Sequence, residues 1–183
     1  MKKVSWREIS AKSTLDVSLK SLDDGPRYLI SIKGPAANIP SLKNGKLPGR
    51  NFINNNVKQH LQALTWLFNC NYNKYGHFPT FGDTNVFMMV VLGNKSKLID
   101  DDNCLAAVRD WLEPPTKSGI DRGWGIGLVN SDRYVTGAAV SYRVVRGEEG
   151  RTLIGLCPLS LYSGRLTNFV HDFFYGMGCK ATL

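Results

Sequence analysis

The chain lacks the features that mark membrane and exported proteins. Its 183 residues contain no apolar run near the roughly 20 residues that a membrane-spanning helix requires. The opening, MKKVSWREIS, turns polar and acidic directly after its lysines, where a secretory signal peptide needs an apolar stretch. We therefore expect a soluble, cytoplasmic protein with no membrane partner.

Cysteines and histidines are few, and their spacing matches no familiar site. No pair of them has zinc-site spacing, and no histidine accompanies a Ser or Cys in a nucleophile motif. A chain of this length does not need disulfides to supplement its core, so the four cysteines are expected to be reduced. We interpret the histidines as packing or surface residues.

Acidic residues are absent between Asp24 and Asp83. The basic residues of this window are Arg27, Lys33, Lys43, Lys46, Arg50, Lys58 and Lys74. They account for nearly the whole formal charge of +8. Such a concentrated positive field favours a polyanion, because neutralised phosphates release condensed counterions. A merely solubilising surface explains the same composition, and composition alone does not decide between the two.

Hydrophobic periodicity predicts an α/β fold built on a mixed sheet. Alternation over 27–34 and a continuous apolar run over 84–94 predict strands, the second of them buried. Further strands are predicted over 126–135, 137–147 and 151–158. Because helices are predicted between these strands, we expect the sheet and the helices to form layers.

Two helices and a long basic loop complete this prediction. Residues 35–50 are rich in Pro, Gly, Asn and Lys, which is typical of a loop. Residues 51–70 carry apolar side chains at helical spacing behind an asparagine cap: Val57, Leu61, Leu64, Trp66, Leu67 and Phe68. A second helix over 103–111 must end before Pro114 and Pro115. Residues 113–125 are predicted to be an exposed connection, and 159–179 to contain an aromatic-rich helix.

Asp100, Asp101 and Asp102 lie directly before the second predicted helix. Carboxylates at this position can cap a helix and suit the positive end of its dipole, but one is enough for that. Adjacent carboxylates repel one another unless a cation offsets the repulsion. In an extended segment, residues two apart point the same way, so Asp100 and Asp102 can face one magnesium ion. Capping and metal binding both remain open at this point.

A basic protein with a carboxylate cluster fits metal-dependent phosphodiester hydrolysis. Cationic side chains bind the phosphate backbone, while the metal ion activates water and stabilises the departing oxygen. Gly123, Gly125 and Gly127 are not followed by the Lys-Ser/Thr pair of a phosphate-binding loop, so no nucleotide cofactor is expected. Trp124 and Tyr134 are either core residues or aromatic faces for unpaired bases.

The stretch DDDNCLAAVRDWL, followed by GLVNSDRYV and VSYRVVRG, resembles the RusA family of Holliday-junction resolvases. The family pattern is Asp-x-Asp-Asn opening a helix, an Asp about seven residues later, then a strand ending in Asp-Asp and a further strand. ISIKGPAANIPSLKNGKLPG is similar to the strand and basic loop that precede the family's first helix. The resemblance covers about residues 28–156 of a single domain over 1–183, with 1–27 and 157–183 as extensions.

The resemblance implies a two-layer α/β homodimer that cuts four-way DNA junctions with Mg²⁺. Asp100 and Asp102 match the metal-binding aspartates of the first motif, and Asp132 matches the second Asp of the later pair. Asn103 matches the motif asparagine, a capping or supporting residue. The expected DNA-binding residues are Lys33, Lys43, Lys46, Arg50 and Lys58.

Two positions depart from the family pattern. Ala106 stands where the family has a functionally important lysine, and Ser131 replaces the first Asp of the later pair. Lys97 or Arg109 is the candidate for the missing positive charge, acting by electrostatic stabilisation of the developing charge. The alternatives are a non-catalytic DNA-binding protein on the same fold and a nuclease for another nucleic acid.

Overall fold

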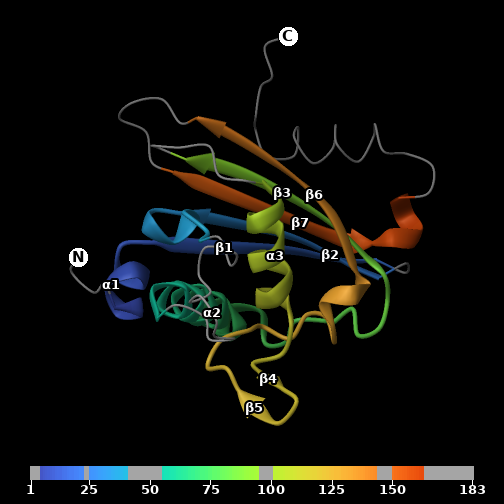
Figure 1. Ribbon diagram of the computed structural model, residues 1–183. Helices are drawn as coiled ribbons and strands as arrows, with labels where there is room; N and C mark the ends of the chain where they lie inside the picture. The colour runs from blue at the N-terminus through green and yellow to red at the C-terminus, as the bar shows by residue number, and fades with distance from the viewer. Residues whose placement is uncertain (1–4, 23–24, 41–54, 95–100, 144–149, 163–183) are drawn as a thin grey trace, which may run out of the picture.

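The computed structural model of the protein describes residues 5–22, 25–40, 55–94, 101–143 and 150–162. A five-stranded sheet with the order β1-β2-β7-β3-β6 forms its centre (Figure 1). The strands are Thr14–Leu22 (β1), Gly25–Lys33 (β2), Val86–Asn94 (β3), Val135–Arg143 (β6) and Arg151–Pro158 (β7). β3 and β6 are parallel, while the other neighbours are antiparallel. The mixed sheet predicted from the sequence is confirmed.

Helices cover one face of this sheet (Figure 1). They are α1 (Trp6–Ala11), the short 3-10 helix η1 (Pro35–Ala37), α2 (Asn55–Tyr75) and α3 (Asp101–Leu112). α3 ends directly before Glu113-Pro114-Pro115, as the helix-breaking prolines predict. None of the helices in the described segments is long and apolar enough to span a bilayer.

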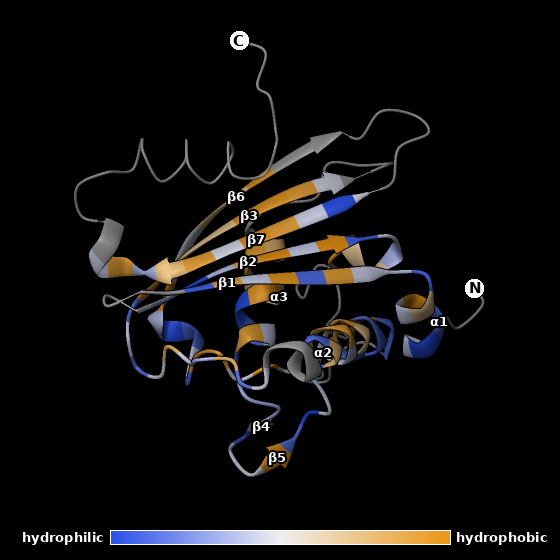
Figure 2. Ribbon diagram, turned by 180° about the vertical axis from the view of Figure 1, so that it is seen from behind, coloured by the Kyte–Doolittle hydropathy of each residue, from blue (hydrophilic) through white to orange (hydrophobic). Residues whose placement is uncertain are grey.

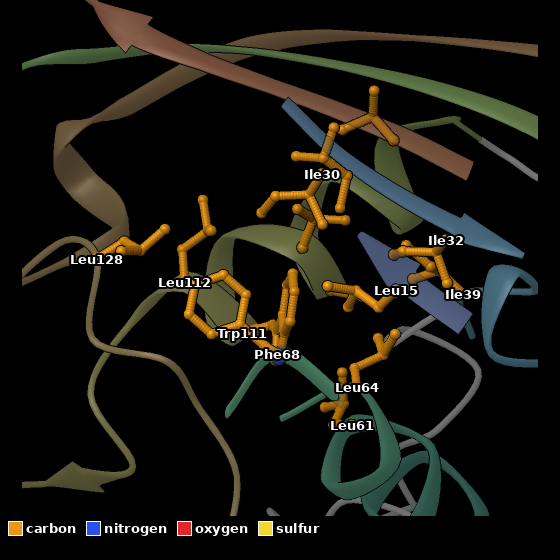
Figure 3. Packing of buried hydrophobic residues seen from close by; sticks show 14 of the residues in the cluster. Leu15, Ile30, Ile32, Ile39, Leu61, Leu64, Phe68, Trp111, Leu112 and Leu128 are labelled. Atoms are coloured by element: carbon orange, nitrogen blue, oxygen red, sulfur yellow. The ribbon is translucent and has the colours of Figure 1, made fainter. Parts of the chain in front are cut away.

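The core lies between the helices and the sheet. Figure 3 shows Trp111 of α3 against Phe68 of α2, with ring centres 5.9 Å apart in an edge-to-face arrangement. β3 is buried on both faces: Met88 and Val90 belong to the core under the helices, whereas Phe87 is buried on the other side. This burial agrees with the continuous apolar run of its sequence, and Figure 2 shows the apolar colouring along β3 and β7.

The N-terminal residues contain two elements that the sequence analysis assigned to an extension. β1 is the edge strand beside β2, with Thr14 opposite Lys33 and Leu22 opposite Gly25. α1 begins with a capping box in which Ser5 and Glu8 satisfy each other's backbone amides. Residues 14–22 therefore belong to the same sheet as β2, β3, β6 and β7.

The strand predicted over 126–135 is wrong. These residues instead close the C-terminal end of α3: the amide of Ile126 donates to the carbonyl of Trp111 at 2.9 Å, and the amide of Leu128 donates to that of Leu112 at 2.9 Å. They thus satisfy carbonyls that a helix end leaves without an intrahelical partner. A 3-10 helix, η3 (Asp132–Tyr134), follows, and β6 begins at Val135. The connection before it carries a small hairpin, β4 (Thr116–Lys117) and β5 (Ile120–Asp121).

Candidate nucleic-acid and metal site

The crossover from β3 through α3 to β6 distinguishes the two ends of the sheet. β3 and β6 are parallel, with Asn94 opposite Arg143 where both strands finish and Val86 opposite Val135 where both begin. α3 starts after the end of β3 and finishes before the start of β6. We call the end of the sheet where β2, β3 and β6 finish the distal end, and the other the proximal end.

The start of α3 carries the predicted metal-binding motif. Asp102 lies in the first turn of the helix, while Asp100 and Lys97 lie outside the described residues. Cys104, Ala107 and Val108 are buried and fix the helix against the sheet. The helix dipole favours negative charge at this position, so the fold suits the aspartates whether or not a cation accompanies them.

Basic residues occur at the distal end on both sides of the sheet: Lys33 and Arg151 lie on the face opposite the helices, and Lys58 lies on α2. Lys33 ends β2 and is the cross-strand partner of Arg151, which starts β7. Lys58 is exposed in the first turn of α2, and two positions later His60 Nε2 lies 2.9 Å from the carbonyl oxygen of Ala36 in η1. This contact holds the start of α2 next to the segment that follows β2.

The described residues that precede the predicted basic loop end beside α3. The Sγ atom of Cys104 lies 3.9 Å from the carbonyl oxygen of Ile39, so the chain just before residue 41 touches the first turns of α3. Lys43, Lys46 and Arg50 lie outside the described residues. The segment that contains them connects the neighbourhood of α3's start to the start of α2.

Asp132 lies at the other end of α3. Its backbone amide donates a 2.9 Å hydrogen bond to a carboxylate oxygen of Glu113, the residue that follows the last residue of α3. Positions 102 and 113 are separated by roughly 16 Å along a helix axis, since each residue adds about 1.5 Å. One chain therefore keeps the backbones of Asp102 and Asp132 at opposite ends of the helix.

The structure reveals a carboxylate at the proximal end that the sequence analysis did not single out. The side chain of Glu113 is 1% exposed and is held by Lys117 Nζ, 2.8 Å from each carboxylate oxygen, and by Arg122 at 3.3 Å. The hydrogen bonds that Lys117 donates to Glu113 also raise the pKa of Lys117. Because Pro114 and Pro115 lie between Glu113 and Lys117, their four-residue spacing is not helical and gives no signal for this pair in the sequence.

Asp110 lies near this network. Its half-buried position raises the pKa of its carboxyl, and repulsion from Glu113 and Asp132 adds to the effect, while Lys117 and Arg122 oppose it. The carboxylates here are spread among basic partners rather than aimed at one point. Within the described segments, no group of three or more His, Cys, Asp or Glu side chains is placed to hold a metal ion.

The candidates for the missing lysine are placed differently. Ala106 is exposed on α3 and brings no charge. Arg109 is partly buried in the last turn of α3, and a seven-residue separation from Asp102 corresponds to roughly 10 Å along the axis. Lys97, which precedes the aspartates in sequence, lies outside the described residues.

The two aromatic residues considered for base stacking, Trp124 and Tyr134, differ in solvent exposure. Trp124 is 2% exposed, with the Arg122 guanidinium 4.1 Å from its ring centre, so it is a core residue. Tyr134 is partly buried, and its hydroxyl accepts a 2.6 Å hydrogen bond from Arg133. Trp124 therefore cannot meet a base without unfolding its surroundings.

Comparison with protein-family models, with curated proteins and with solved structures finds no match for this chain. The distal end combines cations that can hold phosphates with a helix start that carries adjacent aspartates. The proximal end combines a buried carboxylate with its own cations and has the character of a structural network.

Proposed function

We propose that the protein is a metal-dependent endonuclease of the RusA type that cuts branched DNA such as a four-way junction. The observation that carries this proposal is the meeting of two sequence features at one end of the sheet. The first turns of α3, which follow the aspartates, touch Ile39 at the entrance to the basic loop. A phosphate bound beside this contact would therefore lie close to the start of α3.

The residues present fit a hard divalent cation. Mg²⁺ takes one or two protein carboxylates, with water and substrate phosphate oxygens as its other ligands, so Asp100 and Asp102 are sufficient to hold it. When bound, the ion supplies an activated water and charge stabilisation at the leaving oxygen. Lys33, Lys58 and Arg151 would position the DNA backbone, and Lys97 would stabilise the charge that develops on the phosphate.

Asp132 of a second copy of the chain would contribute to this site in a homodimer. In a two-fold pair with antiparallel α3 helices, the start of each helix lies near the end of the other. Asp132 of one copy would then approach Asp102 of its partner, which the separation within one chain prevents. The homodimer implied by the RusA resemblance would thus complete two sites at once, one for each of two strands.

A second candidate is a DNA-binding protein without catalytic activity on the same fold. The exposed Ala106 favours it, because the family places a lysine there and this chain offers a neutral side chain. Such a protein would use the same basic residues at the distal end, and its aspartates would serve to start the helix.

Cleavage assays separate the two candidates. Labelled four-way junction, linear duplex and single strand are incubated with the protein in Mg²⁺ or in EDTA. The nuclease proposal expects paired nicks in the junction that require Mg²⁺ and disappear in Asp102→Asn. Asp16→Asn, which removes an exposed carboxylate from β1, is the matched control and should cut normally. Tight junction binding without cleavage in any divalent metal would support the second candidate and refute the first.

A further inference from the structure

We propose that Trp66, supported by Trp6 and Arg7, is a stacking site for an unpaired nucleobase of single-stranded DNA. The site lies on α1 and α2. It extends the proposed action on branched DNA and rests on it, since unpaired bases are what distinguish such substrates from simple duplex.

The exposure of Trp66 is unlike that of the tryptophans in the core. Its side chain is 47% exposed, whereas Trp111 and Trp124 are 0% and 2% exposed. The helical spacing of α2 predicts that Trp66 belongs to its apolar face, but its neighbours Leu64 and Leu67 occupy the core and leave Trp66 at the surface. A large aromatic ring whose face is exposed to solvent can stack on the planar ring of a ligand.

The aromatic face is held in place before any ligand arrives. The rings of Trp6 and Trp66 have centres 6.2 Å apart and are inclined by 46°. The backbone amide of Trp6 donates a 2.8 Å hydrogen bond to Gln59 Oε1 on α2, which ties the start of α1 to that helix. Stacking on a side chain that is already ordered loses little conformational freedom, so more of the stacking energy appears as affinity.

The charge around these rings suits nucleic acid. The Arg7 guanidinium lies 5.4 Å from the centre of the Trp6 ring. α2 contains no Asp or Glu in its 21 residues. The carboxylate of Glu8, on α1, is engaged by the backbone amide of Ser5 at 2.9 Å and by its hydroxyl at 3.2 Å. The ring pair is thus accompanied by an available guanidinium, and the carboxylate nearest to it in sequence is already hydrogen-bonded.

Trp66 lies on the same helix as Lys58, one of the basic residues at the distal end of the sheet. Lys58 lies eight residues earlier on α2, which corresponds to roughly 12 Å along the helix. A strand whose phosphates contact Lys58 can therefore place a base on Trp66. Because every base has an aromatic face, this contact adds affinity for single strands without reading sequence.

Binding measurements in EDTA test the site apart from any cleavage. Fluorescence anisotropy follows a labelled oligothymidylate and a duplex of equal length, for wild type, Trp66→Ala, Trp66→Phe and Ile120→Ala. Ile120, 68% exposed in the β4–β5 hairpin, is the matched control for loss of an exposed apolar side chain. A cooperative thermal unfolding transition, followed by far-ultraviolet circular dichroism, confirms that each variant is folded.

We expect Trp66→Ala to weaken binding to oligothymidylate about 5-fold or more, as the loss of one stacked base predicts. Duplex binding should change less than about 2-fold, and Trp66→Phe and Ile120→Ala should stay close to wild type on both probes. Equal losses on single strand and duplex, or no loss on either, would overturn the stacking site. Since no metal is present, this result stands apart from the nuclease assay: absent cleavage with Trp66-dependent binding refutes the nuclease alone.

Discussion

The amide of Asp132 donates a hydrogen bond of 2.9 Å to the carboxylate of Glu113, and this contact fixes Asp132 beside the end of α3. The same carboxylate also holds Lys117 and Arg122 from the connection that leads to η3. Glu113 therefore joins the helix end, the β4–β5 hairpin and the start of β6. It is a structural centre at the end of the sheet opposite the predicted metal site.

Replacing Glu113 by Ala should destabilise the protein by about 2 kcal/mol or more. The substitution removes the carboxylate partner of the partly buried Arg122, which keeps its bonds to backbone carbonyls, and leaves the amide of Asp132 without its acceptor. Urea unfolding monitored by tryptophan fluorescence measures the change. Asp16→Asn, at an exposed position, should stay within about 0.5 kcal/mol of wild type, and an equally small effect of Glu113→Ala would contradict the role assigned to this carboxylate.

Asp110→Asn should stabilise the protein at neutral pH. Burial, together with Glu113 and Asp132, raises the pKa of Asp110 above its usual value of 3.8, so the folded state binds this proton more readily than the unfolded chain. The resulting destabilisation is present above the raised pKa and disappears as the pH falls through it toward the usual value. Urea unfolding of wild type and variant at pH 7 and pH 4 should show a gain that shrinks in acid; a loss of stability at pH 7 would count against this explanation.

His60 should make the protein less stable in mild acid. Burial lowers the pKa of His60 from 6.5 to about 4, although its contact with the Ala36 carbonyl opposes the shift. Between these values the unfolded chain takes up a proton that the folded state does not, so stability falls as the pH drops, by about 3 kcal/mol in all. His60→Gln should remove this part of the pH dependence of unfolding, whereas the exposed His77→Gln should retain it. Identical pH profiles for the two variants would argue against the assignment.

Lys33→Gln should reduce the salt dependence of DNA binding. If Lys33 contacts a phosphate at the distal end, its loss lowers the slope of log affinity against log salt by about one, equally for all DNA sequences. Lys20 is the matched control because it is exposed on β1 and pairs with Arg27 at the proximal end. A salt titration of duplex binding that shows the same slope change for both lysines would place the DNA elsewhere.

The sequence predicts most of the fold because its strands and helices are strongly patterned. The apolar run of β3 and the proline pair after α3 are local signals, and the structure agrees with both. β1 has alternating Leu15, Val17 and Leu19. The residues between them are polar, and the N-terminal residues were therefore predicted to be an extension outside the sheet. Residues 126–135 have the composition of a strand. In the structure, however, backbone amides of this segment donate to the carbonyls at the end of α3 and not to a neighbouring strand.

The candidate site is harder to predict from the sequence than the fold, because the distances between its residues depend on how the strands and helices are connected. Motif order alone suggests that Asp102 and Asp132 meet, but their backbones lie at opposite ends of α3. The carboxylate that accepts from the backbone amide of Asp132 belongs to Glu113, which lies nineteen positions from it and matches no family motif. The exposure of Trp66 likewise depends on which face of α2 the sheet covers.

Mixing two inactive variants tests the central claim most directly. Asp102→Asn and Asp132→Asn are each incubated with labelled four-way junction and Mg²⁺, and then combined after dissociation and reassociation. If a site takes Asp102 from one chain and Asp132 from the other, each variant alone is inactive, and the mixture regains nicking at about a quarter of the wild-type sites, because half of the dimers carry one intact site. A mixture as inactive as its components, or an active Asp132→Asn alone, would contradict a site completed between the start of one α3 and the end of another.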